Sequence, residues 1–247
     1  MYLILFVVSF FAGIQNALAG GGSFLTLPTL MFTGLNARTA NITSTIALFP
    51  GQITTGLAGK KHVSDLPRIS FKMLFLISLV GGIIGAFLLI KTPVKIFEYL
   101  VPWLVLFATL VFIWGSYFRK NTESQSYMSP MKTVFLQFII AIYGGYFGGG
   151  IGILMLATLT LSGLAVRNAG ATKNVLAAVM NASAVAVFLF SKDIAWTQAI
   201  VASIGAIIGG QVGAYALHRV NEKLLRVFII VLGLALAVGL FLKAGNI

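Results

Sequence analysis

The sequence contains no cysteine, and histidine and acidic residues are scarce. Two histidines and five Asp or Glu residues are spread over 247 positions. Without cysteine the chain cannot form disulfides, thiolate metal sites or thiol redox centres. So few imidazoles and carboxylates also make a metal centre of ordinary composition unlikely to form. We therefore expect neither a metal nor another cofactor.

Charge of either sign is also sparse, because only 9% of the residues are charged whereas 59% are hydrophobic. The mean hydropathy is +1.01. A soluble domain is about 25% charged and about 45–50% apolar, so this chain could not cover its surface in water. Its apolar runs lack the alternation of a membrane β-barrel. The composition predicts an all-α polytopic membrane protein whose partner is the lipid bilayer.

The net charge of +12 would suggest nucleic-acid binding in a soluble protein. Here the 17 Lys and Arg residues stand singly or in small clusters between apolar runs. This pattern marks cytoplasmic loops in membrane proteins, so nucleic acid is not an expected partner.

The chain contains eight uncharged runs. Six of them have about the length that one membrane helix needs, roughly 17–25 residues. The eight runs are Met1–Ala37, Thr39–Gly59, Met73–Ile90, Tyr99–Phe118, Thr133–Val166, Asn174–Ser191, Ile194–Leu217 and Val227–Leu242. As a single helix, Met1–Ala37 would be about 55 Å long, against a hydrocarbon core of about 30 Å. Thr133–Val166 is too long in the same way, so both runs must break.

Each over-long run contains a glycine cluster near its middle, Gly20–Gly22 in the first and Gly148–Gly150 in the second. Two other interpretations of the first cluster fail. A signal-peptidase site after Ala19 lacks a basic segment before it and would not recur later in the chain. A phosphate-binding loop would need Gly-Lys-Ser/Thr after the glycines. We expect a helix break at both clusters.

The glycine clusters belong to an internal repeat. A shift of 129 residues matches Arg38 with Arg167, and a shift of 128 matches Asp65 with Asp193. The predicted organisation is a first repeat (1–118), a polar inter-repeat loop (119–132) and a second repeat (133–247). Each half should have about four full spans plus a Gly-broken re-entrant or short helix.

The distribution of positive charge favours one topology. If each broken run crosses and returns, one face collects twelve Lys and Arg residues and the other five. If it crosses once, the division is nine to eight, which specifies no orientation. The first arrangement makes the halves inverted repeats, the common plan of secondary transporters. We prefer it, with both termini outside.

In that arrangement the two glycine clusters enter from opposite sides and meet near the midplane. Helices starting near Ser23 and Ile151 would direct free N–H groups at the break and form an anion site. Polar residues opening the following helices would add to it. The predicted substrate-binding residues are Gly20, Gly21, Gly22, Ser23, Asn41, Thr43, Ser44, Thr45, Gly148, Gly149, Gly150, Gly152, Thr172, Lys173, Asn174 and Asn181.

Several of these residues have a second interpretation. Asn, Thr and Ser commonly cap helices, which would explain one or two of the polar cluster. Lys173, whose counterpart Ser44 is neutral, either pairs with a bound anion or marks the cytoplasmic face. Four polar residues within apolar runs either line a cavity or bond between helices, namely Gln15, Asn16, Gln52 and Asn181. The glycines spaced by four at 81–85 and 205–213 indicate close helix packing.

The motifs also resemble a known family. Ala19-Gly-Gly-Gly-Ser-Phe-Leu-Thr-Leu-Pro28 and Ala40–Gly51 are similar to the first-half signature of the sulfite exporter TauE/SafE family. Tyr143–Ala157 and Lys173–Asn181 are similar to its second-half signature. The resemblance implies a bacterial inner-membrane permease for small inorganic or organosulfur anions, sulfite and sulfonates among them. One departure is Gly170, where the family often has Asn.

The expected function is secondary transport of a small anion, with export of sulfite or an organosulfonate preferred. No carboxylate lies well inside an apolar run, whereas proton-driven import usually needs one. Alternatives are a passive anion channel or uniporter, an importer, and a non-transporting membrane scaffold. Catalysis is not expected, because no nucleophile with a base and no metal pair is visible. A homodimer is left open.

Overall fold

The computed structural model describes the chain except for residues 19, 115–126, 217–221 and 245–247. In the described residues it is all-α, with ten α-helices, one short 3₁₀-helix and an isolated bridge between Leu66 and Ile69 in place of strands. The first-half elements are α1 (Tyr2–Leu18), α2 (Ser23–Phe32), α3 (Ala37–Gly59), η1 (Lys60–His62), α4 (Phe71–Lys91) and α5 (Val94–Ile113). The second-half helices are α6 (Pro130–Tyr146), α7 (Ile151–Leu161), α8 (Val166–Phe188), α9 (Trp196–Ala216) and α10 (Glu222–Ala244).

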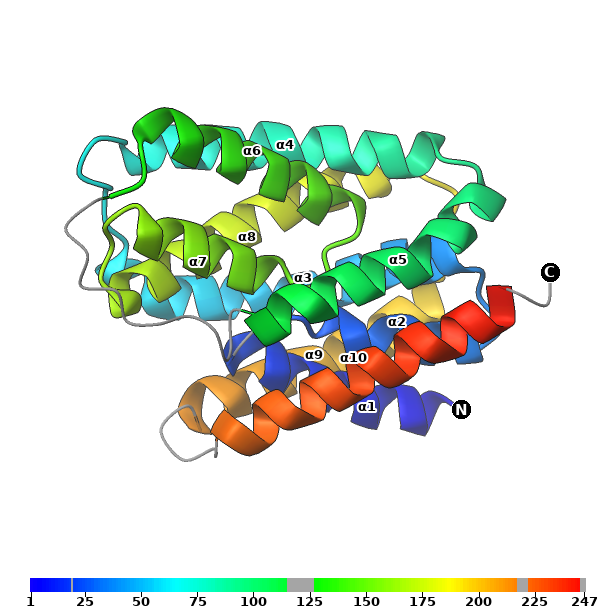
Figure 1. The fold of residues 1–247 in the computed structure, drawn as a ribbon. Helices are drawn as coiled ribbons and strands as arrows, with labels where there is room; N and C mark the ends of the chain where they lie inside the picture. Colours follow the sequence, from blue (N-terminus) through cyan, green and yellow to red (C-terminus); the bar gives the residue numbers. More distant parts are fainter. Residues whose placement is uncertain (19, 115–126, 217–221, 245–247) are drawn as a thin grey trace.

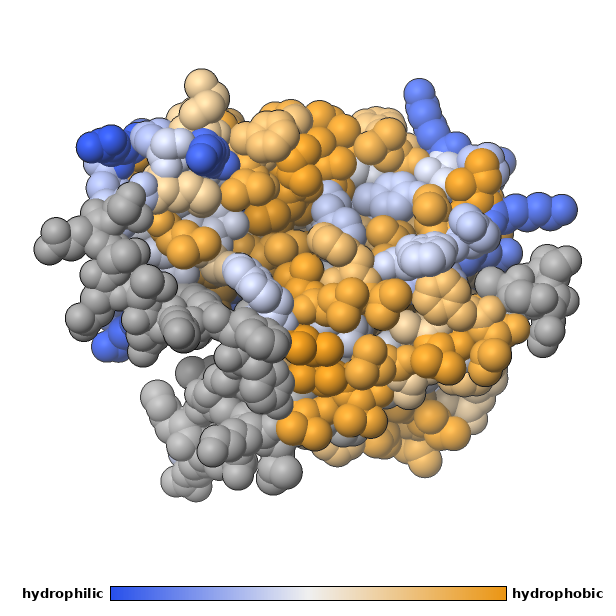
Figure 2. Space-filling view, viewed as in Figure 1, coloured by the Kyte–Doolittle hydropathy of each residue, from blue (hydrophilic) through white to orange (hydrophobic). Residues whose placement is uncertain are grey.

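The helices present an apolar surface suited to lipid. By length and composition, α4, α5 and α8 could each cross a membrane, and α2 and α7 are among the shorter apolar helices. Figure 2 shows a wide hydrophobic band over the middle of the bundle, with hydrophilic residues at its two ends. Large apolar side chains such as Phe32 and Phe190 are almost fully exposed, which water would penalise and lipid does not.

Both over-long apolar runs break at their glycines, as expected. In the first run, α1 ends at Leu18 and α2 begins at Ser23. Gly20 has a φ of +79° and its N–H donates to the carbonyl of Gln15. In the second run, Gly148 has the same φ and donates to the carbonyl of Tyr143, again five residues back. Left-handed backbone costs glycine little, so these residues end α1 and α6 without strain.

Helices α3 and α8 begin earlier in the chain than the uncharged runs predict. The N-cap of α3 is Asn36, whose side chain accepts from the N–H of Thr39 at 2.9 Å. The N-cap of α8 is Ala165, with no side-chain bond. The polar cluster around Asn41 therefore lies inside α3, and the interpretation of its residues as caps is wrong. The same holds for the cluster around Lys173 in α8.

In each half, one helix packs mainly against helices of the other half. Helix α9 packs against α1 and α3, whereas α4 packs against α6 and α8. Helices α3 and α8 contact each other, and α5 packs against α10. Glycines permit these close approaches, as predicted for the motifs at 81–85 and 205–213. A Cβ on Gly209 would lie 1.8 Å from the carbonyl oxygen of Phe10, and one on Gly85 would lie 2.1 Å from that of Ile142.

The start of α1 and the end of α10, the described residues nearest the two termini, lie at the same end of the bundle (Figure 1). Helix α1 leaves from that end, whereas α6 starts at the opposite end, so the halves run through the bundle in opposite directions. The two helix breaks lie inside this interleaved bundle, against α3 and α8.

Candidate functional site

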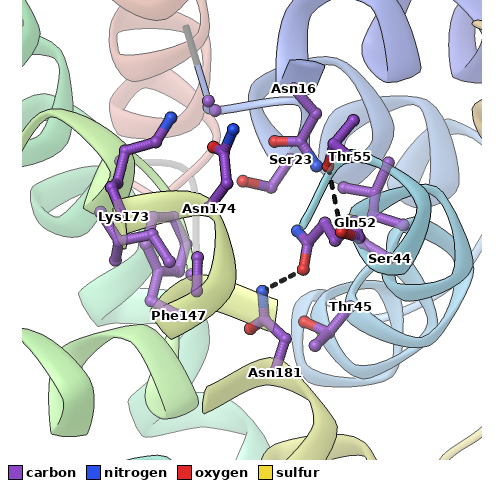
Figure 3. Close-up of a pocket in the computed structure, with 17 residues that line it drawn as sticks. Asn16, Ser23, Ser44, Thr45, Gln52, Thr55, Phe147, Lys173, Asn174 and Asn181 are labelled. Atoms are coloured by element: carbon purple, nitrogen blue, oxygen red, sulfur yellow. Dashed lines mark hydrogen bonds between the residues drawn. The ribbon is translucent and has the colours of Figure 1, made fainter. Parts of the chain in front are cut away.

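A polar cavity of about 40 Å³ lies where the two helix breaks meet α3 and α8 (Figure 3). The breaks approach each other closely, since a Cβ on Gly20 would lie 3.4 Å from the Cα of Gly152. The structure brings ten of the sixteen predicted residues to the cavity wall. They are Gly20, Gly21, Ser23, Ser44, Thr45, Gly148, Gly152, Lys173, Asn174 and Asn181.

The other six predicted residues lie outside the cavity lining. They are Gly22, Asn41, Thr43, Gly149, Gly150 and Thr172. Three of them hold segments together around the site. Asn41 donates to the carbonyl of Tyr146 at 3.1 Å and ties α3 to the end of α6. Thr43 accepts from the N–H of Ala195, and Thr172 accepts from the N–H of Ser64.

The remaining three shape the breaks. The N–H of Gly22 donates to the side chain of Asn16 at 3.2 Å. Gly150 is the N-cap of α7 with a φ of +74°, and it lies against Ala108. Gly149 lies beside Phe147, which is itself a lining residue.

The list of predicted substrate-binding residues omitted several lining residues, although Asn16 and Gln52 were expected to line a cavity or to bond between helices. Asn16, Gln52 and Thr55 are polar, and Phe147 is aromatic. The available signal for Asn16 and Gln52 was a polar residue within an apolar run. Thr55 and Phe147 gave no signal, because threonine and phenylalanine are ordinary in membrane helices.

Lys173 is the only charged residue among the described residues that line the cavity. It lies on α8 and is only 7% exposed. No ion pair or hydrogen bond of its ammonium group occurs within the described part of the chain. An ammonium group at a cavity wall without a protein partner would be stabilised by a negatively charged occupant of the cavity. Figure 3 shows Lys173 and Asn174 on one side of the cavity and Asn16, Ser23 and Gln52 on the other.

Two helix N-termini add partial positive charge to this cavity. Ser23 is the first residue of α2, and Gly152 lies in the first turn of α7. Several first-turn N–H groups already donate to glycine carbonyls, Phe24 to Gly21 and Ile153 to Gly150 among them. The helix dipole still favours an anion at these starts. The cavity therefore combines one ammonium group with two helix starts.

A pair of amides lies at the contact between α3 and α8. Asn181 donates from Nδ2 to Oε1 of Gln52 at 2.5 Å. Asn181 is 129 residues after Gln52, the spacing that matches the two halves of the sequence. The bond leaves the Nε2 donors of Gln52 free to face the cavity, where Figure 3 shows them. The amide pair thus adds further hydrogen-bond donors for an anion.

Ser44 occupies the position equivalent to Lys173 and is engaged differently. Its hydroxyl is bonded to that of Thr26 at 2.5 Å, which joins α3 to α2. The cavity therefore has a neutral, hydrogen-bonded residue at one position and a cation at its counterpart.

Helix breaks that meet at a polar cavity inside an apolar helical bundle are a common plan of membrane transporters. The family model of the sulfite exporter TauE/SafE matches residues 5–240. The chain belongs to this family.

Curated relatives carry related names. A probable membrane transporter protein of Haemophilus influenzae is 30% identical over 93% of this chain and 90% of its own length. A probable membrane transporter protein of Sinorhizobium is 29% identical over 96% of this chain and 90% of its own. A third, from Escherichia coli K12, is 26% identical over 92% and 85%. No solved structure is significantly similar to this chain.

Proposed function

We propose that this membrane transporter is a secondary permease that exports a small anion, sulfite or a small organosulfonate, through the cavity between α3 and α8. The observation that carries the proposal is Lys173, a cation without a protein partner in the described chain, at the wall of a cavity that also includes two helix starts. This arrangement stabilises negative charge without a dedicated arginine. We place the protein in a bacterial inner membrane with many crossings, in keeping with its bacterial relatives.

The architecture supports a carrier built from two inverted copies. The halves run in opposite directions, and each receives one helix from the other in the same way. Gln52 and Asn181, which are equivalent in the repeat, contact each other. Equivalent residues meet only near the two-fold axis that relates two copies. The axis would then pass beside the cavity, as in carriers that rock about a central site.

The volume of the cavity favours a small substrate. A bound water needs about 10–15 Å³, so about 40 Å³ accommodates roughly three waters or a few heavy atoms. Sulfite, with one sulfur and three oxygens, is nearer this size than a long organosulfonate. We therefore rank sulfite first among the candidate substrates.

Export is the direction that membrane energetics favour. The lining includes one cation and no carboxylate among its described residues, so no acidic proton relay is built into the cavity. In a cell with an inside-negative potential, each negative charge that leaves gains roughly 2.3 kcal/mol per 100 mV. Efflux of an anion can thus proceed without a coupling ion.

The decisive experiment measures anion binding to the purified protein. We expect sulfite to raise the melting temperature, and Lys173→Gln to weaken sulfite binding about tenfold or more, since a charge-assisted hydrogen bond contributes about 1.5–3 kcal/mol. The matched control is Lys192→Gln, which removes an exposed lysine outside the cavity. Equal affinities for wild type and Lys173→Gln would refute the proposed site.

Flux measurements then separate the alternatives. Proteoliposomes loaded with sulfite should release it faster when the potential is negative inside. Uptake driven by an ion gradient would assign import instead. Binding and flux both absent, with the protein folded, would favour a scaffold.

A further inference from the structure

Two arginine–aspartate pairs, related by the internal repeat, lie at opposite ends of the bundle. Arg38 and Asp193 lie at the end where α4 finishes. Their counterparts Arg167 and Asp65 lie at the end where α3 finishes, near His62. The two pairs differ in whether their side chains contact each other.

The first pair is closed. Arg38 donates from Nη2 to Oδ2 of Asp193 at 2.8 Å, and from Nη1 to the carbonyl of Thr92 at 2.8 Å. The two side chains are only 17% and 30% exposed. One guanidinium thus joins the start of α3, the end of α4 and the connection between α8 and α9. This contact links the two halves at the end of the bundle that carries the termini.

The counterpart pair is open. In the described structure no ion pair joins Arg167 and Asp65, and both residues are exposed. Arg167 Nη2 lies 3.1 Å from Nε2 of His62 instead. The carboxylate of Asp65 accepts from the N–H of Phe71 at 2.6 Å, at the start of α4. Arg167 and Asp65 therefore each have a partner other than one another.

We infer that these pairs are alternating gates of the carrier, with Arg38–Asp193 closing the end at the termini and Arg167–Asp65 closing the opposite end. The inference rests on the proposed inverted repeat and transport function. If the halves exchange their conformations during transport, the contact at one end must break as its counterpart forms. The structure described here is then the state closed at the termini.

The gate can be tested by thiol accessibility, because the chain has no cysteine of its own. Thr45→Cys places a single thiol in the cavity. A membrane-impermeant thiol reagent, applied from the face with the termini, should react slowly in this parent. Asp193→Ala should increase the rate about fivefold, the effect of losing a partly exposed ion pair. Asp193→Glu, which keeps the carboxylate, should restore slow labelling.

The matched control is Lys91→Gln, which removes an exposed charge at the same end without breaking the pair. It should leave the labelling rate unchanged. Labelling that is equally slow in Asp193→Ala, or equally fast in Lys91→Gln, would overturn the gate at this end.

The opposite gate needs its own measurement. In a chain with Asp65→Cys and Arg167→Cys, a short bifunctional thiol reagent should cross-link slowly, and adding Asp193→Ala should raise the yield about fivefold. An unchanged yield would overturn the alternation. Neither readout requires an anion, so failure of sulfite binding would refute the substrate and leave the gates standing.

Discussion

At the scale of single residues, the cavity depends on a few polar side chains whose partners fix their orientation. Asn181 is 4% exposed and donates to Gln52. Ser44 is held by Thr26. Within the described chain the side chains of Ser23, Lys173 and Asn174 have no hydrogen-bond partner, and Oδ1 of Asn181 is buried without one. These groups are free to bind a ligand, and Lys173 is the charged one among them.

The amide pair can be examined by a double-mutant cycle. Asn181→Leu should lower the free energy of unfolding by about 1–2 kcal/mol, because it leaves Oε1 of Gln52 without a donor. The double variant Gln52→Leu/Asn181→Leu should recover most of this loss, since both polar partners are then absent. Thermal unfolding in detergent measures both. A double variant less stable than the single one would show that the pair does not act as a unit.

At the scale of helices, glycine explains both where the chain breaks and how closely its helices approach. Gly20 and Gly148 both adopt left-handed backbone, and each donates to a carbonyl five residues earlier. Gly85 and Gly209 lie against main-chain carbonyls of neighbouring helices. The same residue type therefore has two roles, and the sequence distinguishes them by their surroundings: clusters in over-long runs break helices, and spacings of four pack them.

The left-handed backbone of Gly20 predicts that alanine at this position lowers the stability of the protein. Gly20→Ala should destabilise the protein by about 1–2 kcal/mol, because a Cβ disfavours a φ of +79°. Gly239→Ala is the matched control. That residue lies within α10 with open space around it, so alanine there should be neutral or stabilise by up to about 1 kcal/mol. Melting temperatures compare the two, and equal shifts would contradict the role of the φ angle.

The uncharged runs located helix cores better than helix starts. The run Asn174–Ser191 omits the first two turns of α8, which begins at Val166 and contains both Arg167 and Lys173. The run Tyr99–Phe118 likewise begins five residues after α5 does. A charge ends an apolar run but not a helix, since Lys173 turns into a cavity and Arg167 lies at an exposed helix end.

At the scale of the whole molecule, two halves that run in opposite directions share one apolar bundle. Helix α4 packs against the second half and α9 packs against the first. Neither half could therefore bury its glycine-lined helices alone. The interleaving also positions both helix breaks at a common cavity.

The proposed inverted topology has a direct test. Lys61→Cys, after α3, and Lys192→Cys, after α8, replace exposed residues at corresponding places in the two halves. If the halves are inverted repeats, the two thiols should label from opposite faces, whereas repeats with the same orientation would place both on one face. Oriented vesicles and an impermeant reagent make the measurement. Labelling from one face only would contradict the topology.

The sequence by itself determined the helical membrane class, the two breaks and most residues of the cavity wall. These follow from local properties: apolar length, glycine conformation and polar residues within apolar runs. Only the tertiary structure decided which of those polar residues share a cavity. Asn41, Thr43 and Thr172 point to neighbouring segments rather than the cavity, and Thr55 and Phe147 line it. The face that a helix turns inward depends on its neighbours, and here those neighbours come from the other half of the chain.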